Sequence, residues 1–162
     1  MKNKYVLLAV VVLGIGITLW AVKRKKSEKQ GEKIESQKGT SMEFIKRPSG
    51  LSYRVEKDGT GETSPRPGQV VEVHYTGWLD NAGTEGTKFD SSLDRGRPFS
   101  FVVGAGQVIK GWDESLLEMR EGEVRYIILP PELAYGSNGA GKVIPPNATL
   151  RFRVELIKIL AQ

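Results

Sequence analysis

The chain of 162 residues has no cysteine and a single histidine, His74. Without cysteine it can form no disulfide, no thiolate nucleophile and no thiolate metal site. One histidine leaves little from which to build a Ser-His-Asp triad or a metal cluster, so we expect neither a metal nor a cofactor. His74 lies in a segment of alternating polarity, which favours an ordinary strand position over a role beside a binding pocket.

The whole sequence has a net charge of +5, but in the larger, C-terminal part of the chain basic residues do not outnumber acidic ones. Residues 1–48 carry 11 Lys or Arg against 4 Glu, whereas residues 49–162 carry 13 basic and 15 acidic side chains. The positive excess therefore belongs to the N-terminal segment, where basic residues favour anionic lipid headgroups. The remainder lacks the one-sided basic stripe that nucleic-acid binding requires, so we expect no nucleic-acid partner.

One long apolar run is present, the 18 uncharged residues 5–22 (YVLLAVVVLGIGITLWAV). At a rise of about 1.5 Å per residue, a helix of this length just spans a hydrocarbon core of about 30 Å. Four consecutive basic residues follow at 23–26. A cleaved signal peptide is the alternative, but no A-x-A pair of small residues lies around Trp20. We predict a single transmembrane helix, from Tyr5 to Val22, that is retained as a membrane anchor.

The flanks of this run also bear on the side of the membrane that the C-terminal part occupies. Basic residues after the run outnumber those before it, which favours the cytoplasm, with the periplasmic or luminal side as the alternative. Residues 23–48 are rich in Lys, Glu, Gln and Ser and predict a charged flexible linker. We therefore divide the chain into a short basic N-terminus (1–4), the anchor (5–22), the linker (23–48) and a folded domain (49–162).

Within residues 49–162, apolar side chains alternate with polar ones, which predicts strands of an antiparallel sheet. The alternating sets are Leu51, Tyr53 and Val55; Val71, Val73 and Tyr75; Phe99, Phe101 and Val103; Val124, Tyr126 and Ile128; and Leu150, Phe152, Val154 and Leu156. Residues 110–119 instead place Trp112, Leu116 and Met119 at helical spacing. The predicted fold class is α+β, with Trp112 between the helix and the sheet at the base of a cavity.

Five short motifs follow one another in this domain. They are VHYTG at 73–77, KFDSS at 88–92, VIKGW at 108–112, AYG at 134–136 and IPPNATL at 144–150. In this order they resemble the FKBP-type peptidyl-prolyl cis-trans isomerases, over about residues 50–160. The resemblance implies an antiparallel half-barrel sheet wrapped around one short helix, with a proline-binding cavity between them. It also implies a monomeric domain, proline-containing polypeptide clients and a macrolide as a further ligand.

The same resemblance assigns individual residues to the cavity. Trp112 corresponds to the floor, and Asp90 and Arg95 to a polar wall. The Tyr135 hydroxyl and the Ile109 backbone N–H correspond to two donors that orient the carbonyls of the ligand. The other lining positions are Tyr75, Phe89, Phe99, Val108, Ile144 and Phe152. Without the resemblance, the strand aromatics favour a plain core, and Asp90 with Arg95 a surface turn and ion pair.

An aromatic cavity with few titratable groups suits the rotation of an X-Pro peptide bond, which resists rotation by about 18–20 kcal/mol. No bond is broken, and the twisted amide is less polar than the planar one, so an apolar cavity stabilises it selectively. We expect an isomerase that assists folding near a membrane; a non-catalytic proline-peptide-binding or chaperone module is the alternative. Ala140 and Gln107 depart from the histidine and the acidic residue of many family members, which affects substrate preference more than activity.

Overall fold

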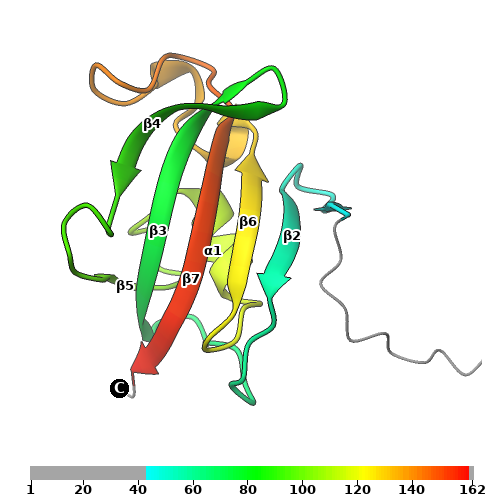
Figure 1. Ribbon diagram of the computed structural model, residues 1–162, viewed down its shortest axis with the longest axis vertical. Helices are drawn as coiled ribbons and strands as arrows, with labels where there is room; N and C mark the ends of the chain where they lie inside the picture. Colours follow the sequence, from blue (N-terminus) through cyan, green and yellow to red (C-terminus); the bar gives the residue numbers. More distant parts are fainter. Residues whose placement is uncertain (1–42, 161–162) are drawn as a thin grey trace, which may run out of the picture. The chain divides into compact units, whose positions relative to one another are not determined.

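A computed structural model describes residues 43–160 of the chain (Figure 1). Seven strands form one antiparallel sheet in the order β1-β2-β6-β7-β3-β4, with β5 also paired to β3. The elements are β1 (Ile45–Lys46), β2 (Ser52–Lys57), β3 (Val70–Asn81), β4 (Thr84–Ser91), β5 (Phe99–Val102), α1 (Lys110–Leu116), β6 (Val124–Leu129), two 3-10 turns, η1 (Pro131–Leu133) and η2 (Gly136–Asn138), and β7 (Leu150–Leu160).

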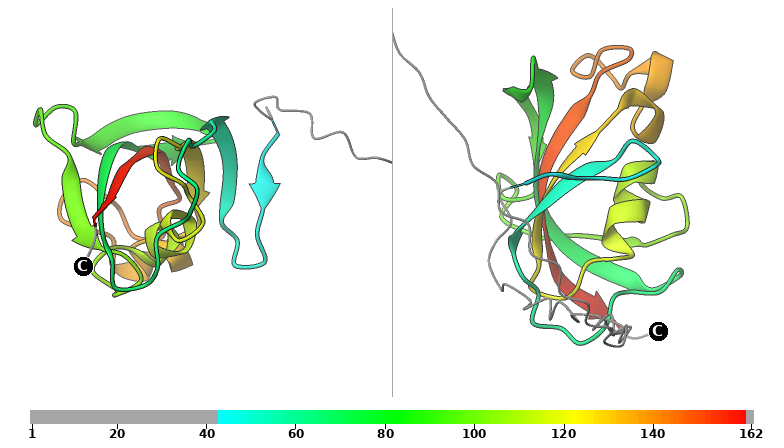
Figure 2. Two further views of the ribbon diagram at one scale, coloured as in Figure 1. Left: turned by 90° about the horizontal axis from the view of Figure 1, so that it is seen from below. Right: turned by 90° about the vertical axis from the view of Figure 1, so that its right-hand side faces the viewer.

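The sheet curves around α1, the one α-helix of residues 43–160, as Figure 2 shows, so the predicted α+β arrangement is confirmed. The predicted anchor, residues 5–22, lies outside the described residues. Within residues 43–160 the structure contains no helix with the length and apolar character that crossing a membrane demands. The last part of the expected linker belongs to the folded domain, because β1 pairs with β2 and places Ile45 opposite Tyr53.

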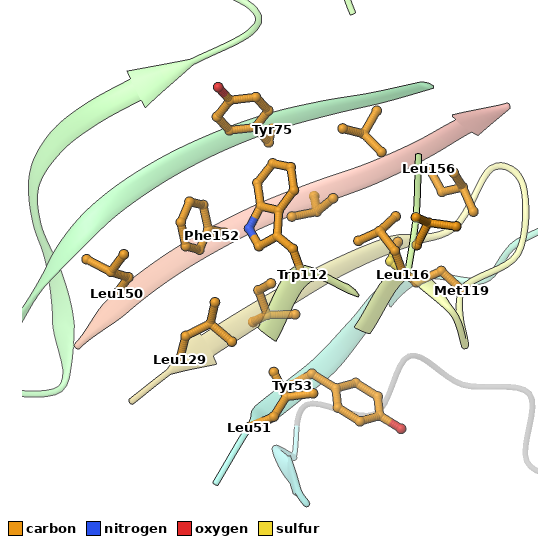
Figure 3. Close-up of a cluster of buried hydrophobic side chains, with 14 of the residues drawn as sticks. Leu51, Tyr53, Tyr75, Trp112, Leu116, Met119, Leu129, Leu150, Phe152 and Leu156 are labelled. Carbon is orange, nitrogen blue, oxygen red and sulfur yellow. The ribbon is translucent and has the colours of Figure 1, made fainter. Parts of the chain in front are cut away.

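The hydrophobic core lies between α1 and the concave face of the sheet (Figure 3). The helix is shorter than the predicted 110–119, but Trp112, Leu116 and Met119 are all buried as the spacing indicated. Gly111 allows the close approach of helix and sheet, because a Cβ at this position would meet Leu129 Cδ2 at 2.3 Å. Trp112 therefore lies where the apolar face of the helix packs against the apolar face of the sheet.

Strand β6 differs from the expected pattern. Tyr126 is opposite Arg153 and points away from the helix, whereas Ile127 is opposite Phe152 on the core face. Tyr126 is nevertheless buried, because the Trp78 ring stacks on it with centroids 6.4 Å apart and the Arg54 guanidinium lies 4.9 Å from its ring centroid. The strand is covered on both faces, so alternation could not identify the face that meets the helix.

Candidate active site

A cavity of about 190 Å³ opens between α1, the sheet and the loops at one end of the sheet. Nine predicted site residues line it, together with Gln107, one of the two positions that depart from the family pattern. The lining residues are Tyr75, Phe89, Asp90, Phe99, Gln107, Val108, Ile109, Trp112, Tyr135 and Phe152. Two predicted residues do not line it: Arg95 contacts the site through Asp90 and Tyr75, and Ile144 is buried against the core.

Trp112 is the centre of the aromatic part of the cavity. Its ring centroid lies 4.8 Å from that of Tyr75 and 5.4 Å from that of Phe152, each with a near-perpendicular arrangement (Figure 3). Edge-to-face pairs of this kind are favoured by the ring quadrupoles and restrict how each ring can turn. Because Trp112 is only 4% exposed, it forms a fixed apolar floor.

The indole nitrogen of Trp112 is buried and has no hydrogen-bond acceptor among residues 43–160. In Figure 3 this nitrogen lies on the side of the Phe152 ring. Phe152, whose ring packs nearly perpendicular to the indole, lines the same cavity.

The polar wall consists of Asp90, Arg95 and Tyr75. The Tyr75 hydroxyl and the Arg95 guanidinium donate to different oxygens of Asp90. Arg95 also donates to the Tyr75 hydroxyl at 2.8 Å, and its guanidinium carbon lies 5.6 Å from the centroid of that ring. The carboxylate is therefore paired and oriented, and it adds no uncompensated charge to the cavity.

The electrostatics of this wall fix the protonation states near neutral pH. Desolvation alone would raise the pKa of Asp90, but the hydrogen bonds from Tyr75 and Arg95 outweigh it and hold this pKa below its ordinary value. Burial raises the pKa of Tyr75, and the hydrogen bond to Asp90 raises it further. Burial and the charge of Asp90 likewise raise the pKa of Tyr135. Asp90 is thus an anion, and both tyrosines keep their hydroxyl protons as donors.

The segment before α1 supplies the backbone donor. The Ile109 N–H has no acceptor among the described residues, so it is available to a ligand carbonyl. Asp113 fixes the preceding loop: its two carboxylate oxygens accept the N–H groups of Gly104 at 2.8 Å and Gly106 at 3.0 Å. The Gln107 side chain accepts the Val102 N–H at 2.9 Å.

Sequence reasoning identified Gln107 only as a departure and did not identify Asp113 at all. The signal for Asp113 was an acidic residue in the first turn of a helix preceded by a Gly-x-Gly loop, since such a loop presents free N–H groups. Gly104 and Gly106 both have positive φ values, 71° and 68°, which glycine adopts without strain.

The rim of the cavity is a short loop that folds on itself. Ala140 and Ile144 exchange backbone hydrogen bonds of 2.9 and 3.1 Å, so the Ala140 position contributes through its backbone. Tyr135 is 40% exposed, and its hydroxyl has no hydrogen-bond partner within residues 43–160. This loop therefore presents a free O–H donor beside the free N–H of Ile109.

His74 lies in β3, as its alternating context predicted, and it does not line the cavity. Its Nδ1 lies 3.0 Å from the hydroxyl of Ser92, which also accepts the Tyr75 N–H at 2.9 Å. Ser92 is fully buried and ties the end of β4 to β3. His74 thus contacts the support of the polar wall and not the cavity itself.

Comparison with known proteins agrees with this geometry. Residues 61–157 match the family described as FKBP-type peptidyl-prolyl cis-trans isomerase. An FK506-binding protein of Neisseria meningitidis serogroup B is 52% identical over 110 residues, which are 68% of this chain and 96% of that protein. Peptidyl-prolyl cis-trans isomerase Fkbp12 of Drosophila melanogaster is 54% identical over 101 residues, 62% of this chain and 90% of that protein.

A solved structure supports the same assignment. The crystal structure of AtFKBP13 superimposes with a TM-score of 0.67 at 41% sequence identity, and the match covers 73% of this chain and 99% of that one. The similarity thus extends over the sheet, the helix and the loops that form the cavity. With its fold, its aromatic cavity and these relatives in agreement, the chain belongs to the FKBP-type peptidyl-prolyl cis-trans isomerases.

Proposed function

We propose that the Trp112 cavity is where this isomerase rotates X-Pro bonds in polypeptide clients. The observation that carries the proposal is an aromatic floor flanked by two unoccupied donors, the Ile109 N–H and the Tyr135 O–H. Among the residues that the structure describes, Asp90 is the only acidic one that lines the cavity, and Arg95 pairs with it. Rotation about an amide bond requires no proton transfer, so the site needs no general acid or base.

The proposed mechanism depends on selective stabilisation of the twisted amide. The Trp112 ring packs against the proline ring and excludes water from the bond that rotates. Because the twisted bond has lost its resonance, it is less polar than the planar one and loses less by leaving water. Ile109 and Tyr135 donate to carbonyls on either side of the proline and hold the chain in the twisted geometry. An acceleration of about ten-thousandfold requires only about 5.5 kcal/mol of such stabilisation.

An exchange assay on the full chain in detergent tests this function. Acceleration of cis-trans exchange in a short X-Pro peptide is expected, and Trp112→Leu should reduce it because Leu leaves part of the floor open. Absence of acceleration by the folded wild-type chain would exclude turnover. The alternative of a non-catalytic chaperone or peptide-binding module would then be favoured if the chain still slowed the aggregation of an unfolded protein.

Several relatives are named FK506-binding proteins, so we also propose that this cavity binds the macrolide. FK506 should compete with the X-Pro peptide and abolish turnover. Quenching of tryptophan fluorescence would report binding at the floor, because Trp112 lies directly in the cavity. Inhibition without any change in the Trp112 signal would place the macrolide elsewhere.

We further propose that residues 5–22 anchor the domain to a membrane and that its clients fold close to that membrane. The uncharged run and its basic flank support this proposal. Retention of the full chain in carbonate-washed membranes, and release when residues 1–26 are deleted, is the expected result. Protease protection in sealed vesicles would then decide between the cytoplasmic side, favoured by the flanking charges, and the periplasmic or luminal side.

A further inference from the structure

A second hollow adjoins the aromatic cavity on the other side of the segment before α1. This groove is open, has a volume of about 490 Å³ and lies between that segment and the start of the rim loop. Its lining residues are Gly106, Gln107, Val108, Ile109, Lys110, Ala134 and Tyr135. Four of them, Gln107, Val108, Ile109 and Tyr135, also line the cavity, so the two hollows share a wall.

A polypeptide substrate has to continue beyond this shared wall. In the proposed mechanism the aromatic cavity holds the proline and the bond before it, and every further residue of an extended chain adds about 3.3–3.6 Å. Ile109 and Tyr135, the residues that carry the two free donors, line both hollows, so a chain held by these donors lies next to the groove. The groove is therefore continuous with the bound part of the substrate.

The groove differs from the cavity in its charge. Lys110 is the only basic or acidic residue that lines it, and its side chain is exposed and forms no ion pair within residues 43–160. In the cavity, by contrast, Asp90 is neutralised by Arg95. The neighbouring acids of α1 are engaged elsewhere: Asp113 accepts backbone N–H groups and Glu114 accepts the Ser49 hydroxyl.

We propose that this groove is a second substrate subsite and that Lys110 gives it a preference for an acidic side chain near the proline. The inference rests on the proposed isomerase function, because it assumes that the X-Pro bond occupies the Trp112 cavity. An exposed ion pair contributes about 0.2–1 kcal/mol, which corresponds to about a 1.4- to 5-fold preference for Glu over Gln at the matching position.

The test uses the full chain in detergent and peptides with Glu, Gln or Lys at each of two positions before and two positions after the X-Pro pair. A higher kcat/KM for Glu than for Gln is expected on one side of the proline only. The preference should disappear in Lys110→Gln and turn in favour of Lys in Lys110→Glu. Because the ratio is taken within each variant, a general loss of turnover does not affect it.

Lys158→Gln is the matched control, because it removes the same charge from an exposed position of β7 that lines neither hollow. It should keep both the turnover of an uncharged peptide and the preference for Glu. If the uncharged peptide is not turned over by the wild-type chain, the proposed function itself fails. If it is turned over, a preference that is equal on both sides of the proline, or that survives in Lys110→Gln, overturns the subsite.

Discussion

The loop that presents the Ile109 N–H is fixed by one carboxylate, so we expect Asp113→Asn to impair turnover although Asp113 does not line the cavity. In the native chain, Oδ1 accepts the Gly104 N–H at 2.8 Å and Oδ2 accepts the Gly106 N–H at 3.0 Å. Asparagine keeps one oxygen but turns an NH2 group toward the other glycine, which sets two donors against each other.

The size of the effect follows from these two bonds. A hydrogen bond to a charged group contributes about 1.5–3 kcal/mol, and the partial exposure of Asp113 moves the value toward the lower end. If the transition state loses about 1–2 kcal/mol of stabilisation because the loop is displaced, kcat/KM falls by about 5- to 30-fold. The decrease should fall mainly on kcat, because a displaced Ile109 N–H stabilises the twisted amide less than the planar one.

Glu114→Gln is the control for the loss of charge, since it changes the next residue of α1, whose carboxylate accepts the Ser49 hydroxyl at 2.7 Å. Exchange with an X-Pro peptide gives kcat and KM, and amide hydrogen exchange at Gly104 and Gly106 reports the state of the loop. The reasoning is refuted if both glycine amides lose protection in Asp113→Asn while kcat/KM remains equal to that of Glu114→Gln.

Three further predictions concern the wall, the rim and the core. Tyr135→Phe keeps the ring and removes one donor, so kcat/KM should fall by about 2- to 10-fold with no change in the unfolding midpoint in urea. Because Tyr75 and Arg95 hold the pKa of Asp90 below its ordinary value despite desolvation, the wall should remain intact down to about pH 4; kcat/KM that falls between pH 7 and pH 5 would contradict this. Glu123→Gln breaks the buried ion pair with Arg125, in which the Glu123 side chain is 8% exposed and that of Arg125 6%. Urea unfolding should show a loss of about 3–5 kcal/mol in the free energy of unfolding, while the turnover of the folded chain is not lowered.

The sheet and the helix could be predicted because their burial follows their sequence period. In β7, Leu150, Phe152, Val154 and Leu156 are all buried on the helix side, as alternation indicated. In β6 the same rule selected Tyr126, which lies on the outer face beneath the Trp78 ring. Alternation identifies a buried face only where the opposite face meets water, and side chains from other strands cover the outer face at β6.

The lining residues were predicted from the family resemblance that the order of the motifs carries. The physical properties of each residue taken alone would not have identified them. Phe99 and Phe101 are neighbours in an alternating strand, yet Phe99 lines the cavity at 36% exposure and Phe101 is buried at 5%. Composition cannot separate the two, because both are aromatic residues on the same face. The expected lining residue Ile144 packs in the core, and its backbone exchanges hydrogen bonds with Ala140 across the rim loop.

Three residues support the site through side chains that bind backbone groups, and the sequence did not reveal this role for any of them. Asp113 and Gln107 accept N–H groups on either side of the loop before α1, and the Ser92 hydroxyl accepts the Tyr75 N–H. When a peptide bond rotates without proton transfer, the rate depends on where the donors and aromatic rings are placed, because no reactive group compensates for poor placement. Substitutions at these supports should therefore change how fast the bond rotates, whereas substitutions at Lys110, outside the aromatic cavity, should change which peptides are rotated.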